Sequence, residues 1–426
     1  MDKLLKSLST INYWNKVPDF NLGFIRKRYL NANWVSIGNK LVKVIIGQRR
    51  SGKSYIVRQL IDKLINDKGV NKLNIFYLNK EMFEFEEIKN ANDLSLIINK
   101  YEKIYLPKGK VYIFIDEVQN IEEWEKIVVS LAQHPIKEYE VFITGSNSKM
   151  LSGELATLLS GRYVLNEVFP FSFKEYLDFR NINNSKENFI KYITSSAMPE
   201  VFNFDTNEIK FHYFQSLLNT ILLKDIMQRH KIRDYILLED IFLFLLNNVG
   251  NMTSIPSIIK YFKSKNRKSD YGTISQYISF MKEAFIIREA SRFSLKTKEI
   301  LSGEKKYFLT DLGFRNYLYP NLIKDISAIL ENIVFTHLKI AGYEVKLGYE
   351  NNYEIDFFAT KNQNSKYIQV SYLMQTQETI NREFTALEKI KDNLPKYVIT
   401  MDDILLQNEN GIIHQHIWKF IYSLVK

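Results

Sequence analysis

One short stretch, between residues 41 and 54, constrains the fold of this chain more than any other. Leu41-Val42-Lys43-Val44-Ile45-Ile46 is an apolar run rich in β-branched residues, and Gly47-Gln48-Arg49-Arg50-Ser51-Gly52-Lys53-Ser54 follows it directly. From Tyr55 to Ile65 the apolar residues recur with helical spacing. A buried strand, a loop bounded by glycines and a helix, in this order, predict a phosphate-binding loop at one edge of a parallel sheet.

The residue types of this loop meet the needs of a nucleotide phosphate. A phosphate binds to aligned N–H groups at a helix N-terminus, and glycines let the backbone curl around it. Lys53 is predicted to reach the β- and γ-phosphates, and the Ser54 hydroxyl to bind magnesium. The predicted cofactors are therefore ATP and Mg²⁺, held by Gly47, Gln48, Arg49, Arg50, Ser51, Gly52, Lys53, Ser54 and Tyr55.

An acidic pair is predicted to supply the second half of this site. Asp116-Glu117 follows the apolar run Val111-Tyr112-Ile113-Phe114-Ile115 directly. The carboxyl ends of parallel strands meet at one sheet edge, which is where α/β proteins bind their ligands. We therefore predict that Asp116 lies in the magnesium shell and that Glu117 orients or deprotonates the attacking water.

Two further polar candidates lie beyond this pair. Thr144-Gly145-Ser146-Asn147-Ser148 ends a third apolar run, so Asn147 or Ser146 could sense the γ-phosphate, although a helix N-cap would use the same residues. Arg162, in Leu159-Ser160-Gly161-Arg162, is a candidate arginine finger, because a guanidinium stabilises charge on a transferring phosphoryl group. An ordinary surface arginine is the alternative, and the sequence leaves open whether Arg162 serves its own site or a neighbour's.

The order of apolar runs and helical stretches divides the 426 residues into four parts. Alternating strands and helices predict a doubly wound α/β domain over 1–170, followed by a helical linker over 171–235. Over 236–320, a helix at 237–248, a helix opened by Thr253-Ser254, a Thr273-capped helix to Ala284 and a two-stranded ribbon predict a winged helix-turn-helix. Residues 321–426 alternate helix and strand again, which predicts a separate α/β unit.

The net charge of +10 is concentrated in the middle of the chain. The segment from Lys224 to Lys306 contains 16 Lys and Arg against 9 Asp and Glu, a balance of +7. A winged helix would offer Thr273 to Lys282 to the major groove, so DNA is a predicted partner through residues 263–298. The predicted phosphate contacts are Lys263, Lys265, Arg267, Lys268, Arg288, Arg292, Lys296 and Lys298. A solvated surface, or a docking module for an unknown protein, is the alternative.

Several classes of protein are disfavoured by composition. The chain has no cysteine, which excludes disulfides and cysteine-based zinc sites. No run approaches the roughly 20 apolar residues of a membrane-spanning helix. The N-terminus lacks the apolar region of a secretory signal. We expect a cytoplasmic protein without membrane contact.

The motifs, taken in order, resemble those of a known family. The loop Gly47–Ser54, Ile115-Asp116-Glu117-Val118-Gln119, Thr144–Ser148 and Leu159–Arg162 succeed one another as in the AAA-family ATPases of bacteria and archaea that carry a C-terminal domain of unknown function. Pro170-Phe171-Ser172-Phe173-Lys174-Glu175-Tyr176 and Met198-Pro199-Glu200 look like the linker motifs of that family. The resemblance covers nearly the whole chain and implies an AAA-like ATPase domain.

The C-terminal unit looks like the restriction-endonuclease-like nuclease fold. The site of that fold holds a helix Glu, a strand Asp, and an acidic or Gln residue two positions before a Lys, and Glu331, Asp356 and Gln369 match the first three. Ser371 occupies the lysine position. A neutral hydroxyl cannot stabilise an attacking hydroxide as an ammonium would, so we predict a vestigial site that does not cleave nucleic acid.

The combined prediction is an enzyme, an AAA-like P-loop ATPase. Binding and hydrolysis of Mg-ATP would drive or gate a conformational switch on DNA or a protein partner. A nucleotide-gated regulator with little turnover and an active ATP-dependent nuclease are the alternatives. The oligomeric state and the adenine contacts are left open.

Overall fold

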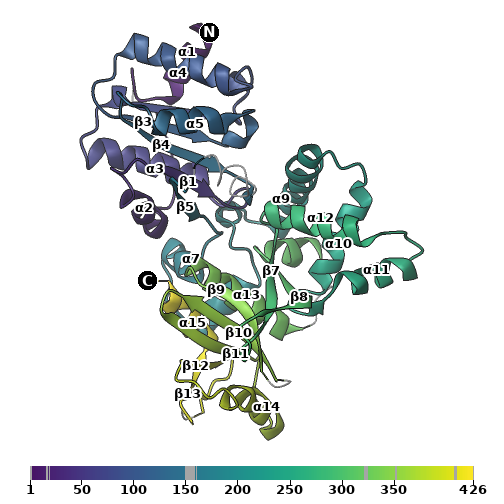
Figure 1. Cartoon of the computed structure of the whole chain (residues 1–426). Helices are drawn as coiled ribbons and strands as arrows, with labels where there is room; N and C mark the ends of the chain where they lie inside the picture. Colours follow the sequence, from purple (N-terminus) through teal and green to yellow (C-terminus); the bar gives the residue numbers. More distant parts are fainter. Residues whose placement is uncertain are drawn as a thin grey trace. The chain divides into compact units, whose positions relative to one another are not determined.

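The chain has two compact units, Met1–Val168 and Phe169–Lys426 (Figure 1). The computed structural model describes residues 2–15, 18, 20–148, 159, 161–320, 325–350, 353–406 and 410–425. Among these residues no helix is both long and apolar enough to cross a membrane. The finer division at residues 235 and 320 stays a prediction.

The first unit is a parallel sheet of five strands in the order β2-β3-β4-β1-β5. This arrangement confirms the predicted P-loop NTPase fold class, because the strand that precedes the phosphate loop lies inside the sheet. The elements are α1 (Asp2–Ile11), α2 (Lys27–Trp34), β1 (Val42–Ile46), α3 (Lys53–Asn66), β2 (Ile75–Asn79), α4 (Ala91–Tyr105), β3 (Val111–Asp116), α5 (Trp124–Ala132), β4 (Tyr139–Gly145) and β5 (Tyr163–Glu167), with short 3₁₀ turns at Lys72–Asn74, Phe83–Phe85 and Val118–Asn120.

The inner strands of this sheet are apolar because helices lie along the sheet and bury them. All five residues of β1 and all six of β3 are buried, and the rings of Phe114 and Phe142 stack with centroids 4.5 Å apart. Lys43 is the exception on β1, and it forms a fully buried ion pair with Glu140 of β4. Its Nζ also donates to Asn39 Oδ1 at 3.0 Å. A buried charge is tolerated here because it is paired and hydrogen-bonded.

The second unit is built on one mixed sheet of eight strands, in the order β13-β12-β11-β10-β9-β7-β8-β6. Its N-terminal part contains α7 (Phe173–Arg180), α8 (Lys186–Ile193), a 3₁₀ turn (Pro199–Asn203), α9 (Asn207–Asn219), a π-helical segment (Thr220–Gln228), α10 (Tyr235–Asn247), β6 (Met252–Thr253), α11 (Ile255–Ser264), α12 (Tyr271–Glu283), β7 (Ile287–Ser294) and β8 (Ile300–Leu309). A second π-helical segment (Phe314–Leu318) is followed by α13 (Ile326–Ile340), β9 (Glu344–Glu350), β10 (Tyr353–Lys361), β11 (Asn364–Val370), α14 (Gln377–Glu388), β12 (Lys396–Thr400), β13 (Ile412–His416) and α15 (Ile417–Leu424).

The predicted ribbon is β7 and β8, which pair antiparallel, but it is not a free wing. β7 also pairs in parallel with β9, with Arg292 opposite Leu347 and Ser294 opposite Tyr349. The ribbon and the C-terminal strands therefore form one continuous sheet (Figure 1). This pairing brings residues of β8 next to the C-terminal strands, across the division predicted at residue 320. The winged-helix interpretation stays a prediction.

One predicted helix boundary is wrong in detail. The sequence predicts Thr273 as the cap of the last helix before the ribbon, but α12 begins at Tyr271 and its N-cap is Asp270. The Asp270 carboxylate accepts the N–H of Thr273 at 3.0 Å, and the Thr273 hydroxyl donates to the same carboxylate at 2.6 Å. Aspartate competes well with threonine as an N-cap, because an anion is stabilised at the positive end of a helix.

His337 of α13 makes the second unit sensitive to acid. It is fully buried, its Nε2 accepts the N–H of Phe173 at 2.9 Å, and its Nδ1 donates to the carbonyl of Ile333 at 2.8 Å. Burial lowers the pKa of His337 from 6.5 to about 4. Between these two pKa values the unfolded chain binds a proton at His337 and the folded chain does not. The contribution of the neutral His337 to the free energy of unfolding is therefore fully present above about pH 6.5 and is lost as the pH falls towards 4.

We expect the free energy of unfolding of the second unit to fall by up to about 1.4 kcal/mol per pH unit in this window because of His337. Urea unfolding followed by circular dichroism at about pH 7.5, 5.5 and 4.5 measures this slope. His337→Gln is the matched control, because its amide can make both hydrogen bonds and does not titrate. Parallel pH profiles for the two proteins would contradict the prediction.

Candidate nucleotide-binding site

The loop between β1 and α3 has the backbone that a phosphate cradle requires. Gly47 has φ +150° and Gly52, the N-cap of α3, has φ +97°. A Cβ on Gly47 would lie 2.1 Å from the carbonyl oxygen of Val168, so no side chain fits there. α3 begins at Lys53, and its first N–H groups face the loop. Both glycines are thus required by conformation, and Gly47 is also required by space.

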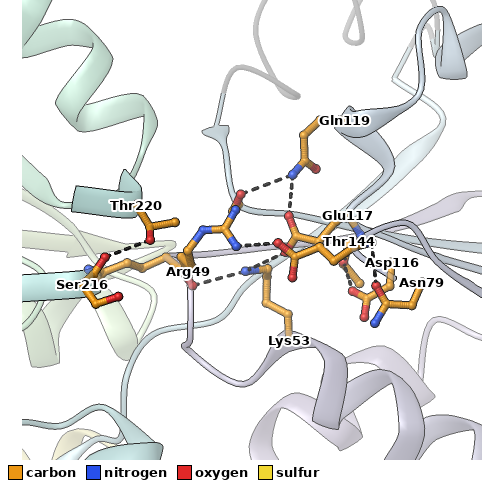
Figure 2. A network of polar contacts seen from close by, with 12 residues as sticks. Arg49, Lys53, Asn79, Asp116, Glu117, Gln119, Thr144, Ser216 and Thr220 are labelled. Carbon is orange, nitrogen blue, oxygen red and sulfur yellow. Dashed lines mark hydrogen bonds and ion pairs between the residues drawn. The ribbon is translucent and has the colours of Figure 1, made fainter. Parts of the chain in front are cut away.

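The ammonium of Lys53 lies inside the loop. It is buried and donates to the carbonyl oxygens of Gly47 and Gln48 at 3.1 and 3.2 Å. It also forms an ion pair with Oε1 of Glu117 (Figure 2), and the two atoms lie 3.4 Å apart. Lys53 and Glu117, the second residue of the acidic pair, are far apart in the sequence and lie next to each other in space.

Asp116 lies at the carboxyl end of β3 and is completely buried. Its carboxylate accepts a hydrogen bond from the hydroxyl of Thr144 (Figure 2). It also accepts hydrogen bonds from the hydroxyls of Ser54 and, at 3.3 Å, Tyr77. Burial and then the charge of Glu117 raise the pKa of Asp116, although the hydrogen bonds from Ser54 and Thr144 oppose the change. A carboxylate in this environment gains strongly from a bound cation. Hydroxyl and carboxylate oxygens are what Mg²⁺ prefers, so Ser54 and Asp116 fit this ion.

Glu117 is held by three neighbours. Its φ is +55°, a conformation uncommon for residues other than glycine, and its N–H donates to Thr144 Oγ1 at 3.0 Å. Oε2 accepts from Nε2 of Gln119, which lies 3.3 Å from Ser146 Oγ. Burial alone would raise the pKa of Glu117, but Lys53 and Gln119 outweigh it and lower the pKa. Glu117 is therefore an ionised acceptor at neutral pH, suited to holding a water molecule.

Two residues outside the phosphate loop, Arg26 and Gln59, hold the loop and the segment beside it in place, and the sequence patterns predict no role for either. Arg26 is buried, its Nη1 donates to the carbonyl of Ser51 at 2.8 Å, and its guanidinium lies 4.4 Å from the ring centroid of Tyr29. Gln59 of α3 donates to the carbonyls of Leu22 and Phe24 at 2.7 and 2.9 Å, which holds the N-terminal segment beside the loop. The only signal in the sequence is the basic run Arg26-Lys27-Arg28.

The loop itself contains polar atoms without partners. Both amide atoms of Gln48 and the hydroxyl of Ser51 are buried and make no hydrogen bond within the described part of the chain. Buried polar groups almost always find a partner, in the protein, in water or in a ligand. These unpaired atoms in the loop fit a site that is completed by a polar ligand.

The other residues predicted for the nucleotide site differ in burial and in their contacts. Asn147 is buried just after β4, on the sheet edge of the loop. Arg49 pairs with Glu81, whereas Arg50 and Tyr55 are exposed. Ser160, in the motif around Arg162, lies outside the described residues.

Arg162 lies at the wrong edge of the sheet for its own site. It immediately precedes β5, and β5 pairs in parallel with β1, so that Tyr163 lies opposite Val42 and Glu167 opposite Ile46. The loop follows Ile46, roughly 13 Å further along the strand. An arginine side chain does not bridge that distance, so the interpretation that Arg162 completes its own site is corrected. That Arg162 acts as an arginine finger in the nucleotide site of a neighbouring copy stays a prediction.

The predicted phosphate contacts of the basic segment divide into two groups. Arg267 forms ion pairs with Asp234, at 3.2 Å, and Asp240, and Arg292 lies 4.5 Å from the ring centroid of Tyr349. Arg288 Nε donates to Thr310 at 3.2 Å. These arginines therefore have intramolecular partners, contrary to the expectation that all eight face DNA. The exposed members of the set are Lys263, Lys265, Lys268, Lys296 and Lys298.

The residues that resemble a nuclease site do come together. Glu331 of α13, Asp356 of β10 and Gln369 of β11 lie at one place in the second unit, where Gln369 Oε1 accepts the N–H of Asp356 at 3.3 Å. Ser371, at the position where the fold usually has a lysine, is buried, and its N–H donates to the carbonyl of Ile399 at 3.1 Å.

The parallel sheet, the glycine-bounded loop and the acidic pair after β3 together define a P-loop NTPase domain of the AAA type. A family model described as an AAA domain matches residues 39–177, and a model for a domain of unknown function (DUF8612) matches residues 186–325. An uncharacterized protein of Haemophilus influenzae is 36% identical over 381 residues, which cover 88% of this chain and 92% of that protein. The uncharacterized protein MJ1544 of Methanocaldococcus jannaschii is 34% identical over 389 residues, 86% and 83% of the two chains. The chain belongs to one family with these two proteins, and its residues 39–177 are an AAA domain.

Two solved structures illustrate more distant similarity. The Walker-type ATPase of Pyrococcus abyssi has a TM-score of 0.42 and 13% identity, over 70% of this chain and 96% of that one. DnaA from Aquifex aeolicus bound to AMPPCP has a TM-score of 0.32 and 16% identity, over 64% and 93%.

Proposed function

We propose that the first unit binds Mg-ATP and hydrolyses it, and that the nucleotide state switches the conformation of a module that contacts DNA or a protein. The observation that carries this proposal is the convergence of two pairs, Lys53 with Glu117 and Ser54 with Asp116, at the carboxyl ends of β1 and β3. A site that only binds a nucleotide needs no more than the phosphate loop. An ionised glutamate next to the lysine is the additional group that hydrolysis needs.

Each side chain has a distinct part in the proposed reaction. The N–H groups of the loop and Lys53 hold the β- and γ-phosphates, which replace the carbonyls of Gly47 and Gln48 as partners of the ammonium. Ser54 and Asp116 would hold Mg²⁺, which would offset the phosphate charge when bound. Glu117 accepts a proton of the attacking water, and Gln119 keeps the carboxylate oriented. Asn147 would contact the γ-phosphate from the end of β4.

The partner is proposed from the exposed lysines of the second unit. Lys263, Lys265 and Lys268 lie at the end of α11 and in the turn before α12, and within the described residues none of the three forms an ion pair, unlike Arg267. A surface of this charge suits a polyanion, and phosphate contacts would make binding depend on salt. We favour DNA, with a protein partner as the other outcome.

The decisive experiment measures ATP turnover by the full chain with DNA, RNA or protein fractions present. We expect turnover that depends on Mg²⁺ and is lost, by at least about 100-fold, in Lys53→Ala, because the β- and γ-phosphates lose their cation. Lys68→Ala is the matched control, since Lys68 is exposed just beyond the same helix. Turnover at background in every condition, with ATP still bound, would contradict hydrolysis and favour a nucleotide-gated regulator.

DNA contact is tested in the same samples. Replacing Lys263, Lys265 and Lys268 together by glutamine should weaken DNA binding and reduce the dependence of log K on log salt by about 0.9 for each contact removed. An affinity that is independent of salt and unchanged in the triple variant would contradict the DNA proposal and leave the protein partner.

A further inference from the structure

Arg49, the third residue of the phosphate loop, forms an ion pair at the edge of the sheet where the nucleotide site lies. Its Nη1 lies 2.5 Å from Oε1 of Glu81. Glu81 comes two residues after the end of β2, and the last residue of that strand, Asn79, lies opposite Asp116 of β3. The ion pair therefore joins the loop after β1 to the segment after β2, next to the strand that carries the acidic pair.

The guanidinium of Arg49 also acts on Glu117. In Figure 2 the Arg49 side chain points towards the Glu117 carboxylate. Burial would raise the pKa of Glu117, but the charge of Lys53, the hydrogen bond from Gln119 and then the charge of Arg49 lower it. A general base must reach the water that attacks the γ-phosphate, so a cation beside Glu117 is also near that phosphate.

The partner of Arg49 in the structure is a weak one. The Arg49 side chain is 12% exposed, whereas Glu81 is 37% exposed, so solvent screens the ion pair from the carboxylate side. A phosphate carries more negative charge than a carboxylate, and it binds a guanidinium through two parallel hydrogen bonds. A γ-phosphate in the site would therefore compete successfully with Glu81 for Arg49.

The other arginines of the first unit that were considered for the site are placed differently. Arg26 donates to a carbonyl on the outside of the loop, and Arg58 lies over two aromatic rings. Arg50 is exposed, and Arg162 lies before β5, at the opposite edge of the sheet. Arg49, in contrast, faces the proposed base (Figure 2).

We propose that Arg49 is a catalytic residue that binds the γ-phosphate of ATP within its own chain, and that Glu81 holds it aside in the absence of a γ-phosphate. This inference rests on the proposed hydrolysis of ATP by the first unit. The guanidinium neutralises the charge that develops on the phosphoryl oxygens, which is the role of an arginine finger. When Arg49 turns to the phosphate, Glu117 loses part of the positive charge that lowers its pKa and becomes a stronger base.

The first test measures, by calorimetry, the affinity of the full chain for Mg-ADP and for the Mg²⁺ complex of a non-hydrolysable ATP analogue. We expect Arg49→Ala to weaken binding of the analogue by at least about 30-fold and binding of ADP by less than about 3-fold, because only the analogue has a γ-phosphate. An arginine that only held the loop in shape would weaken both nucleotides equally. Arg49→Gln replaces Arg49→Ala should the latter unfold, which thermal unfolding reports.

Glu81→Gln is expected to have the opposite effect. Without the competing carboxylate, the analogue should bind about 3-fold more tightly, and the affinity for ADP should stay unchanged. Glu84→Gln is the matched control, since Glu84 is an exposed carboxylate on the same segment, and it should bind both nucleotides as the unmodified chain does. Weaker binding of the analogue by Glu81→Gln would contradict the competition between Glu81 and the γ-phosphate.

The second test measures ATP turnover. Arg49→Ala should lower kcat by at least about 1,000-fold, and guanidinium ion added to the solution should restore part of the turnover to Arg49→Ala but not to Lys53→Ala. Lys126→Ala, which removes an exposed cation that pairs with Glu123, is the control and should leave kcat unchanged.

Two results would overturn the inference: an equal loss of affinity for ADP and for the analogue in Arg49→Ala, or a kcat for Arg49→Ala within about 3-fold of the unmodified chain. An unmodified chain that binds both nucleotides but hydrolyses no ATP would contradict the proposed function. The difference between ADP and the analogue would then still decide whether Arg49 binds the γ-phosphate, because that measurement needs no turnover.

Discussion

Replacing Glu117 by glutamine is expected to lower kcat for ATP hydrolysis by about 1,000-fold while Mg-ATP binding stays within a few-fold of normal. Glutamine keeps the shape of the side chain and its contact with Gln119, but it cannot accept a proton from water. The lowered pKa of Glu117, caused by Lys53 and Gln119 against the effect of burial, means that the unmodified residue is ionised at neutral pH. Single-turnover hydrolysis and fluorescent-nucleotide binding separate the two quantities.

Glu123 offers a matched control for this variant. It is another glutamate on the segment that follows β3, and it shares the left-handed backbone of Glu117, with φ +55°. Unlike Glu117 it is exposed, and it pairs with Lys126. Glu123→Gln should leave both turnover and binding unchanged. If Glu117→Gln hydrolysed ATP at the normal rate, Glu117 would not be the base, and the water would have to be held by another group near Asn147.

The sequence predicts the half of this site that depends on local chemistry. A glycine-bounded loop after a buried strand has few alternative structures, and an acidic pair at a strand end must lie at the same edge once the sheet is parallel. The residues that escape prediction act across the fold. Tyr77 reaches Asp116 from the neighbouring strand, and Arg26, which immediately precedes α2, donates to the carbonyl of Ser51. Neither position has a spacing relation to the loop.

A count of basic residues in the sequence also fails to predict which of them are exposed. Arg267 and Lys263 are equivalent in a count of basic residues, yet Arg267 is held by Asp234 and Asp240 while Lys263 is exposed. The carboxylates that neutralise Arg267 lie 33 and 27 residues earlier, at the N-cap and within α10, so only tertiary structure reveals the pairs. The local balance of +7 is real, but only part of it lies on exposed side chains.

Lys306 shows the same limit in the opposite direction. The expected position of a lysine is two residues after Gln369, and Ser371 there argues for a silent site. The structure instead brings in a lysine from β8, far earlier in the chain, because the ribbon pairs with β9 and becomes part of the C-terminal sheet. A motif that is confined to one strand cannot reveal a contact of this kind.

Gly47 of the phosphate loop has a positive φ and is tightly enclosed, so an alanine there would suffer both backbone strain and collision. Gly38→Ala is a control that tests the backbone strain alone. Gly38 also has a positive φ, +101°, but no atom lies within 4 Å of the place that an added methyl group would take. We therefore expect Gly38→Ala to lower the free energy of unfolding by about 1–3 kcal/mol and to leave nucleotide binding intact.

Gly47→Ala, in contrast, is expected to abolish nucleotide binding, with a loss of at least about 100-fold in affinity for Mg-ATP. The added Cβ would lie 2.1 Å from the Val168 carbonyl oxygen, so the loop must shift, and the N–H groups that hold the phosphates shift with it. Calorimetric titration with a non-hydrolysable ATP analogue measures the loss. Equal binding by the Gly47 and Gly38 variants would mean that the loop tolerates the displacement and that its geometry at Gly47 does not set the affinity.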